Sequence, residues 1–209
     1  MQTGFNRRQF LSTSLGTAGL LMSGGLTAAA EAAAAAEPAD RSKDAPTSPV
    51  SIQRCESYEP QIVRARLDAA IDQIGGIGKL VANKTVTIKI NVTGGPGELA
   101  GLPGFRTYHI HPNVLAALCA AIVDAGAKQI VVVESQYSPK SPEEVLTAGG
   151  WDINAIKAAG NHKVTFEDTR NRGQFPDYSK LVVPWGGFLF PAFMLNQRYE
   201  KTDVFISLS

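Results

Sequence analysis

The sequence of 209 residues suits one folded domain with a tail, because 44% of its residues are hydrophobic and 19% are charged. Met1–Ala30 contains two arginines and no acid, so its removal leaves 18 of the 20 basic residues against 19 acidic ones, a net charge of about −1. This balance argues against proteins that bind nucleic acid or anionic lipid through a basic surface.

The first 30 residues have the features of an export signal. Asn6–Leu11 (NRRQFL) resembles the twin-arginine signal, in which paired arginines precede a bulky apolar pair, and an uncharged run then extends to Ala30. Ala28–Ala30 offers small residues to a signal peptidase. We expect the twin-arginine export machinery to deliver the protein to the periplasm or another extracytoplasmic compartment, and residues 1–30 to be cleaved.

An uncleaved membrane anchor is the alternative, because the same apolar run approaches the ~20 residues that cross a bilayer. The glycines, serines and threonines of this run make a poor lipid-facing helix. Cleavage is therefore favoured, and we expect no stable membrane span after it.

The folded part is predicted to begin near Val50. Residues 31–49 are rich in Ala, Pro, Asp and Ser and have no large apolar side chain, which predicts a flexible leader before an α/β domain over residues 50–209. Val50–Arg54 suits an opening strand. Apolar residues then recur at three- and four-residue steps over 60–74 before two glycines, which predicts a helix.

The next stretch combines a strand, a glycine-rich loop and a helix start. Apolar and polar residues alternate along Thr85–Ile90, which predicts a strand, and Lys89 and Asn91 leave it on the same side. Seven Gly or Pro residues follow between positions 94 and 104. A histidine pair, His109 and His111, then precedes a proline that suits the first residue of a helix. This arrangement is typical of a ligand site.

A second unit repeats the same order of elements. We predict a helix from Pro112 to Gly126, a strand Gln129–Val133 followed by Glu134 and Ser135, a capped helix from Ser141, a helix Asp152–Ala159, and a strand Lys163–Phe166 followed by Glu167 and Asp168. Strands joined by helical crossovers run parallel. The sequence therefore predicts an α/β fold with an open, largely parallel sheet and helices on both faces, whose polar strand ends meet at the carboxyl edge.

The C-terminal part is less regular. Leu181–Val183 suits a strand, and the aromatic segment Trp185–Met194 is interpreted as core rather than as an exposed partner surface. Asp203–Leu208 suits a buried strand. Because chain ends normally lie at the surface, we expect the sequence to be the N-terminal portion of a longer protein, with a sheet that is incomplete at its C-terminus.

A family resemblance rests on three ordered segments: VTIKINVTGG, HIHPNVLAALCAAIVDAGAKQIVVVES and TDVFISLS. Over residues 50–209 the chain resembles the domain of unknown function 362 family. The positions that match the family's pattern are Lys89, Asn91, His111, Pro112, Gly126 and Ser135, while Glu134 stands where an aspartate is usual. The resemblance implies the fold and the neighbourhood of a site, and some members are associated with iron–sulfur modules.

The two cysteines, Cys55 and Cys119, are too few for the thiolate ligands of an ordinary iron–sulfur cluster, so no such ligand set is expected within this chain. Export would permit a disulfide between them. Cys119 lies within the apolar run LAALCAAIV, where a buried free thiol is the favoured interpretation.

The first chemical hypothesis is a site for a small anionic ligand at the carboxyl edge. Its residues would be Lys89, Asn91, His111, Glu134 and Ser135, with the helix start at position 112 adding a favourable dipole. The alternative is that Lys89 is a solvated strand residue and Asn91 makes a turn. The loop lacks the GxxxxGK[ST] and GxGxxG patterns of nucleotide sites.

The second hypothesis is a divalent metal site formed by His109 and His111 with Glu134 or Asp168, since residues two apart in an extended segment point the same way. The alternative is that His111 caps the helix and His109 faces solvent. A third hypothesis is an exported, non-catalytic binding module or a partner of an iron–sulfur redox system. It is favoured by the lack of GxSxG and HExxH motifs in the sequence.

Overall fold

The computed structural model describes residues 43–93 and 97–209. The predicted signal peptide over 1–30, most of the predicted leader and the first glycines of the glycine-rich loop lie outside these described residues. Val50–Arg54 is the first predicted element that the structure describes.

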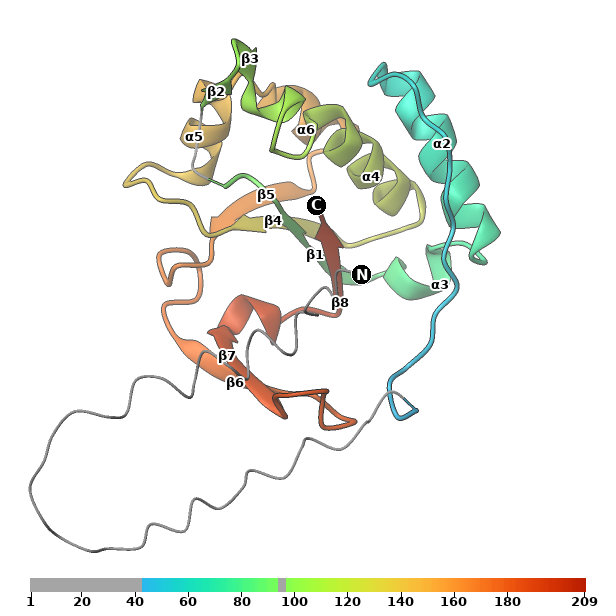
Figure 1. Ribbon diagram of the computed structural model, residues 1–209, viewed down its shortest axis with the longest axis vertical. Helices are drawn as coiled ribbons and strands as arrows, with labels where there is room; N and C mark the ends of the chain where they lie inside the picture. The colour runs from blue at the N-terminus through green and yellow to red at the C-terminus, as the bar shows by residue number, and fades with distance from the viewer. Residues whose placement is uncertain (1–42, 94–96) are drawn as a thin grey trace, which may run out of the picture. The chain divides into compact units, whose positions relative to one another are not determined.

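Four parallel strands form the central sheet (Figure 1). They are β1 (Thr85–Ile90), β4 (Gln129–Glu134), β5 (Val164–Asp168) and β8 (Val204–Leu208), and their order across the sheet is β5-β4-β1-β8. The register aligns their carboxyl ends, with Lys89 opposite both Val133 and Ser207. This arrangement confirms the predicted α/β fold with a parallel sheet and helices around it.

One face of the sheet carries the main core. Ile88 and Val132 are buried on this face and pack with Leu118 of α4 (Pro112–Asp124) and Ile156 of α6 (Ile153–Ala159). Burying one such side chain stabilises the fold by about 1.5–3 kcal/mol. The α4 sequence suits this role, because it opens with proline and most of its residues are apolar.

The remaining helices surround this core. They are α2 (Pro60–Gln73), α3 (Gly78–Val81), α5 (Pro142–Ala148) and the 3-10 helix η1 (Gly104–Arg106). The capping box predicted at Ser141 is present, with both of its reciprocal bonds to Glu144. No helix among the described residues is long and apolar enough to cross a membrane.

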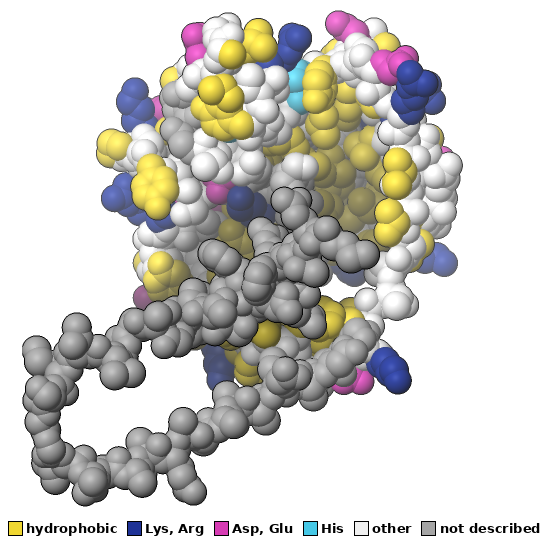
Figure 2. All heavy atoms as spheres, viewed as in Figure 1, with side chains coloured by type: hydrophobic (Ala, Val, Ile, Leu, Met, Phe, Trp, Pro, Cys, Tyr) yellow, Lys and Arg dark blue, Asp and Glu magenta, His cyan; other side chains and the backbone are white. Residues whose placement is uncertain are grey.

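Helix α2 packs against α4, and Arg64 of α2 forms an ion pair with Asp124 of α4. An apolar cavity of about 420 Å³ lies beside α2, lined by residues of the segment 53–58, by Val63 and Leu67 of α2 and by Val114 of α4. Figure 2 shows hydrophobic side chains gathered in the hollow between these helices.

The C-terminal part of the chain contacts the opposite face of the sheet. Here β6 (Tyr178–Val182) and β7 (Ala192–Asn196) form an antiparallel pair, followed by the 3-10 helix η2 (Gln197–Tyr199). Tyr199 contacts Phe205 of β8, with 5.5 Å between ring centroids. A smaller antiparallel pair, β2 (Glu98–Leu99) and β3 (Leu102–Pro103), lies within the glycine-rich loop.

Three sequence-based expectations are wrong. Val50–Arg54 forms no strand, because it lies on neither edge of the sheet, and Ile52 is 88% exposed. The aromatic segment Trp185–Met194 is exposed rather than core, because β6 and β7 form a sheet of their own. Strand β8 is half-buried rather than buried, because it is an edge strand, and Phe205 is 48% exposed.

Candidate functional site

The centre of the carboxyl edge is an ion pair between neighbouring strands. Lys89 lies at the end of β1 and Glu134 at the end of β4, and Lys89 Nζ is 3.2 Å from each carboxylate oxygen. The Glu134 side chain is 8% exposed, whereas the Lys89 side chain is 33% exposed. The pair therefore has a buried anion and a cation that reaches solvent.

Two backbone donors hold the Glu134 carboxylate in place. Val92 N donates to Oε2 and Ser135 N donates to Oε1, both at 2.8 Å. Hydrogen bonds to a charged acceptor are the stronger kind. Glu134 is thus fixed by the two strand ends, and it fixes the position of Lys89 in turn.

Asn91 closes the base of the glycine-rich loop. Its carbonyl accepts from Ile110 N at 3.0 Å, its Nδ2 donates to Tyr108 O at 3.3 Å, and its Oδ1 accepts from Thr93 Oγ1 at 2.9 Å. His109 Nε2 is also 2.9 Å from Thr93 O. These bonds support the turn-forming role that was the alternative for Asn91.

His111 is the N-cap of α4. Its Nδ1 accepts from Asn113 N at 3.2 Å, and its ring stacks on Tyr58 with centroids 4.0 Å apart. Burial, followed by the nearby Arg106 charge, lowers the pKa of His111 below its ordinary value. The ring is therefore a neutral capping group, and it occupies an amide that an anion at the helix start would use.

The predicted metal set is not assembled. Asp168 pairs with Arg170, while Glu134 pairs with Lys89 and His111 caps α4. The segment before His109 is a turn rather than extended, since Thr107, Tyr108 and His109 all donate to Gly104 O. Within residues 43–93 and 97–209, no three His, Cys, Asp or Glu side chains are grouped so that they could hold a metal ion.

Burial raises the pKa of Asp168, but hydrogen bonds from the Arg170 side chain and backbone outweigh this effect and hold it below its ordinary value. Its neighbour Glu167 forms a buried ion pair with Arg198, at 2.7 Å from Nη2, with side chains 8% and 6% exposed. Sequence reasoning missed both arginines. Arg170 follows its carboxylate by two residues, which was an available signal, whereas Arg198 lies in η2, far along the chain from Glu167.

Gln136 was also missed, although it follows Glu134 by two residues. It is 2% exposed, and neither Oε1 nor Nε2 has a hydrogen-bond partner among the described residues. The charge of Glu134 also acts on Tyr199: burial raises the pKa of the Tyr199 hydroxyl, and Glu134 raises it further. The end of β4 therefore has a fixed carboxylate paired with a cation and, two residues later, an unpaired buried amide.

Both cysteines are free thiols. Cys55 is exposed, whereas Cys119 is buried within α4, and burial raises the pKa of Cys119 to about 12. The favoured interpretation of Cys119 is confirmed.

Comparison with known proteins gives one family. The model described as "Domain of unknown function (DUF362)" matches residues 86–209, which is more than half of the chain. No curated protein and no solved structure matches the chain.

Proposed function

The chain belongs to the DUF362 family, and we propose that this member is an exported protein that binds a small anion at the carboxyl edge of its sheet. The observation that carries the proposal is Lys89, a partly exposed ammonium held 3.2 Å from the fixed carboxylate of Glu134. The matched residues include β4, β5, β8 and all of β1 except Thr85, so Lys89 and Glu134 both fall within the family match.

Lys89 is the anion-binding group in this proposal. An ammonium has three donors, and the donors that do not reach Glu134 can bind a carboxylate or phosphate oxygen that approaches from solvent. Because Val92 and Ser135 hold Glu134, the position of Lys89 is set before the ligand arrives. Such pre-organisation lowers the entropy cost of binding.

Gln136 supports a ligand at the same edge. A buried polar group without a partner costs about 1–3 kcal/mol, so proteins rarely keep one without a reason. A bound anion with a hydroxyl or an additional oxygen could accept from Nε2 or donate to Oε1 of this amide. We therefore include Gln136, which follows Glu134 by two residues, in the proposed site.

A ligand screen by thermal unfolding tests the binding proposal, because a ligand that binds only the folded state raises the apparent stability. Inorganic phosphate and citrate are the first probes. We expect the shift to disappear in Lys89→Ala and to persist in Lys128→Ala, an exposed lysine just before β4 at the opposite edge. Equal shifts in both variants would exclude Lys89 as the binding group.

Export is the second half of the proposal, and it rests on the twin-arginine resemblance of residues 6–11. Replacing Arg7 and Arg8 by lysine should retain the protein in the cytoplasm, and mass spectrometry of the exported form should find cleavage after the alanines at 28–30 or 32–36. An exported form that keeps residues 1–30 would contradict the predicted cleavage.

A further inference from the structure

We propose that the open edge of β5 binds an extended acidic peptide of a partner protein, which adds to the sheet as a further strand. This surface is separated from Lys89 by β4, and it uses none of the residues assigned to the anion site. The proposal therefore stands or falls independently of that site.

The backbone of β5 is arranged for pairing on its outer side. Among the described strands, β5 pairs with β4 alone. Ile130 N donates to Lys163 O and Thr169 N donates to Glu134 O, so the odd-numbered residues of this segment face β4. Because backbone groups alternate in direction along a strand, the N–H and C=O of Phe166 point to the outer side. Such an edge is a template for another chain.

A cavity of about 520 Å³ runs along this edge. Its lining includes four consecutive residues of β5, Thr165–Asp168, together with the loop Pro139–Pro142 and residues 172–174. A cavity that follows a strand for four residues suits an extended chain, whose backbone would lie beside Phe166.

The carboxylates in this lining are already neutralised. Glu167 is paired with Arg198, and its Oε1 also accepts from Gln174 N at 3.1 Å. Asp168 is paired with Arg170, which donates to it through Nε at 3.0 Å. These two acids therefore do not repel an incoming anion as free carboxylates would.

Two further cations line the cavity without forming an ion pair among the described residues. Lys140 and Arg172 are exposed, and neither forms an ion pair within the part of the chain that the structure describes. Arg172 Nη1 donates to Ser138 O at 3.4 Å, and its charge also acts on Asp168. The charge of Lys140 acts on Glu144, whose carboxylate accepts from Ser141. The lining holds Lys140, Arg172 and Arg198 against Glu167 and Asp168. The cavity therefore carries a net positive charge that favours an acidic ligand.

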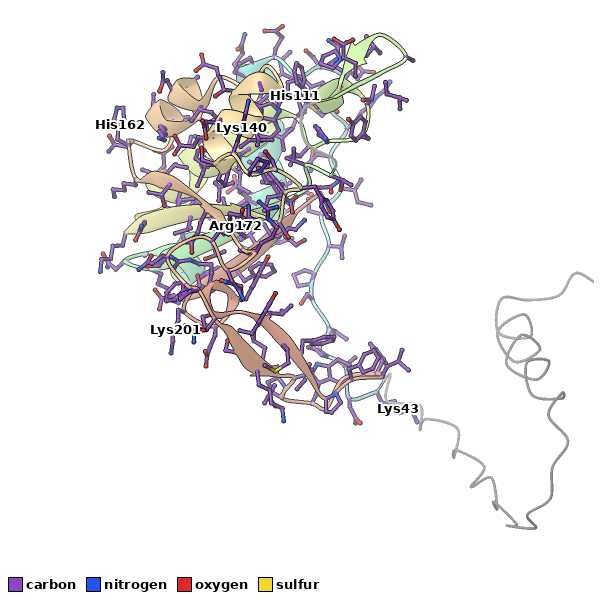
Figure 3. All side chains as sticks on the ribbon, turned by 90° about the vertical axis from the view of Figure 1, so that its left-hand side faces the viewer. Lys43, His111, Lys140, His162, Arg172 and Lys201 are labelled. Atoms are coloured by element: carbon purple, nitrogen blue, oxygen red, sulfur yellow. The ribbon has the colours of Figure 1, made fainter. Side chains whose placement is uncertain are left out.

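The two cations flank β5 from different faces. Lys140 precedes α5, whose Leu146 packs into the main core, while residue 173 packs against the Glu167 side chain on the face covered by η2. Figure 3 looks onto this side of the molecule and labels Lys140 and Arg172. Neighbouring side chains of an added strand point to opposite faces. Two consecutive acidic residues of the peptide would therefore reach both cations.

Fluorescence anisotropy with the full chain tests this inference. The probe is a labelled peptide of sequence VTEDTV with blocked ends, compared with VTQNTV and with VTEDTV that is N-methylated at its central amides. We expect VTEDTV to bind, and each of the other peptides to bind about tenfold more weakly, because one loses the charges and the other loses the strand hydrogen bonds.

Substitutions in this chain test whether the peptide binds beside β5. Lys140→Gln and Arg172→Gln should each weaken VTEDTV about threefold to fivefold, the range expected for partly exposed ion pairs. Lys43→Gln, which changes an exposed lysine of the N-terminal segment, should leave binding unchanged. Failure of VTEDTV to bind, or unchanged binding in both glutamine variants, would overturn the proposal. Equal binding of the N-methylated peptide would also overturn it, by showing that charge acts without strand pairing.

Discussion

Replacing Gln136 by methionine should have opposite effects on two properties: it should make the protein more stable and make its anion binding weaker. The Gln136 side chain is 2% exposed, and both of its polar atoms lack a hydrogen-bond partner among the described residues. Leaving such a group unpaired costs about 1–3 kcal/mol, whereas a methionine of similar length has no polar atoms that need hydrogen bonds. We expect Gln136→Met to raise the free energy of unfolding by about 1–3 kcal/mol in the absence of ligand.

The assay is urea unfolding followed by intrinsic tryptophan fluorescence, to which the buried Trp151, 4% exposed, contributes together with Trp185. Gln61→Met is the matched control, because Gln61 is exposed on α2 and its replacement should change stability by less than about 0.5 kcal/mol. The same Gln136→Met variant should bind phosphate or citrate more weakly than the parent protein. If the variant is destabilised by more than about 1 kcal/mol, the Gln136 amide must have hydrogen-bond partners in the folded protein.

Four other predictions test the remaining parts of the structure. Arg198→Met should destabilise the protein by about 3–5 kcal/mol in urea unfolding, because it leaves the Glu167 carboxylate buried without its cation; a loss below about 1 kcal/mol would contradict this. Stability should fall as pH drops from the ordinary histidine pKa through the lowered pKa of His111, because the folded state favours the neutral ring, and His111→Asn should flatten this part of the pH profile. Ser141→Ala should cost about 1 kcal/mol through loss of the cap, with no such cost expected for an exposed serine elsewhere. A thiol reagent should modify Cys55 rapidly and leave the buried thiol of α4, whose pKa burial raises to about 12, unmodified until the protein unfolds.

The parts of the fold that the sequence predicted well are those where periodicity and end signals agree. The alternation of Thr85–Ile90 gave the bounds of β1, and the proline at 112 with the glycine at 126 located α4. The parallel order followed from helical crossovers between strands. Lys89 and Glu134 were expected at one edge because both lie at the carboxyl ends of parallel strands. In the structure Lys89 Nζ is 3.2 Å from Glu134 Oε1.

The local geometry of the loops was not predictable in the same way. The metal hypothesis assumed an extended chain at His109 and His111. In the structure the backbone N–H groups of residues 107–109 all donate to Gly104 O, and His111 is the N-cap of α4. The core interpretation of Trp185–Met194 assumed that aromatic residues pack inside, whereas their two-stranded sheet leaves Phe190 60% exposed. In both cases the outcome depends on which distant segments lie nearby, which composition does not reveal.

The ion pairs of β5 also join residues that are distant in the sequence, so sequence patterns could not predict them. Arg198 lies 31 positions from its partner Glu167, and no spacing rule connects them. The cavity beside β5 likewise combines a loop after β4 with a loop after β5. Such sites become visible only when the order of strands across the sheet is known.

Titration calorimetry with inorganic phosphate measures whether Lys89 binds an anion at the carboxyl edge. We expect one site per chain in the parent protein and in Lys128→Ala, and affinity reduced by about tenfold or more in Lys89→Ala, since a hydrogen bond from a charged donor is worth about 1.5–3 kcal/mol. Equal affinity in all three proteins, or no binding of phosphate and citrate by any of them, would show that Lys89 is not an anion-binding group.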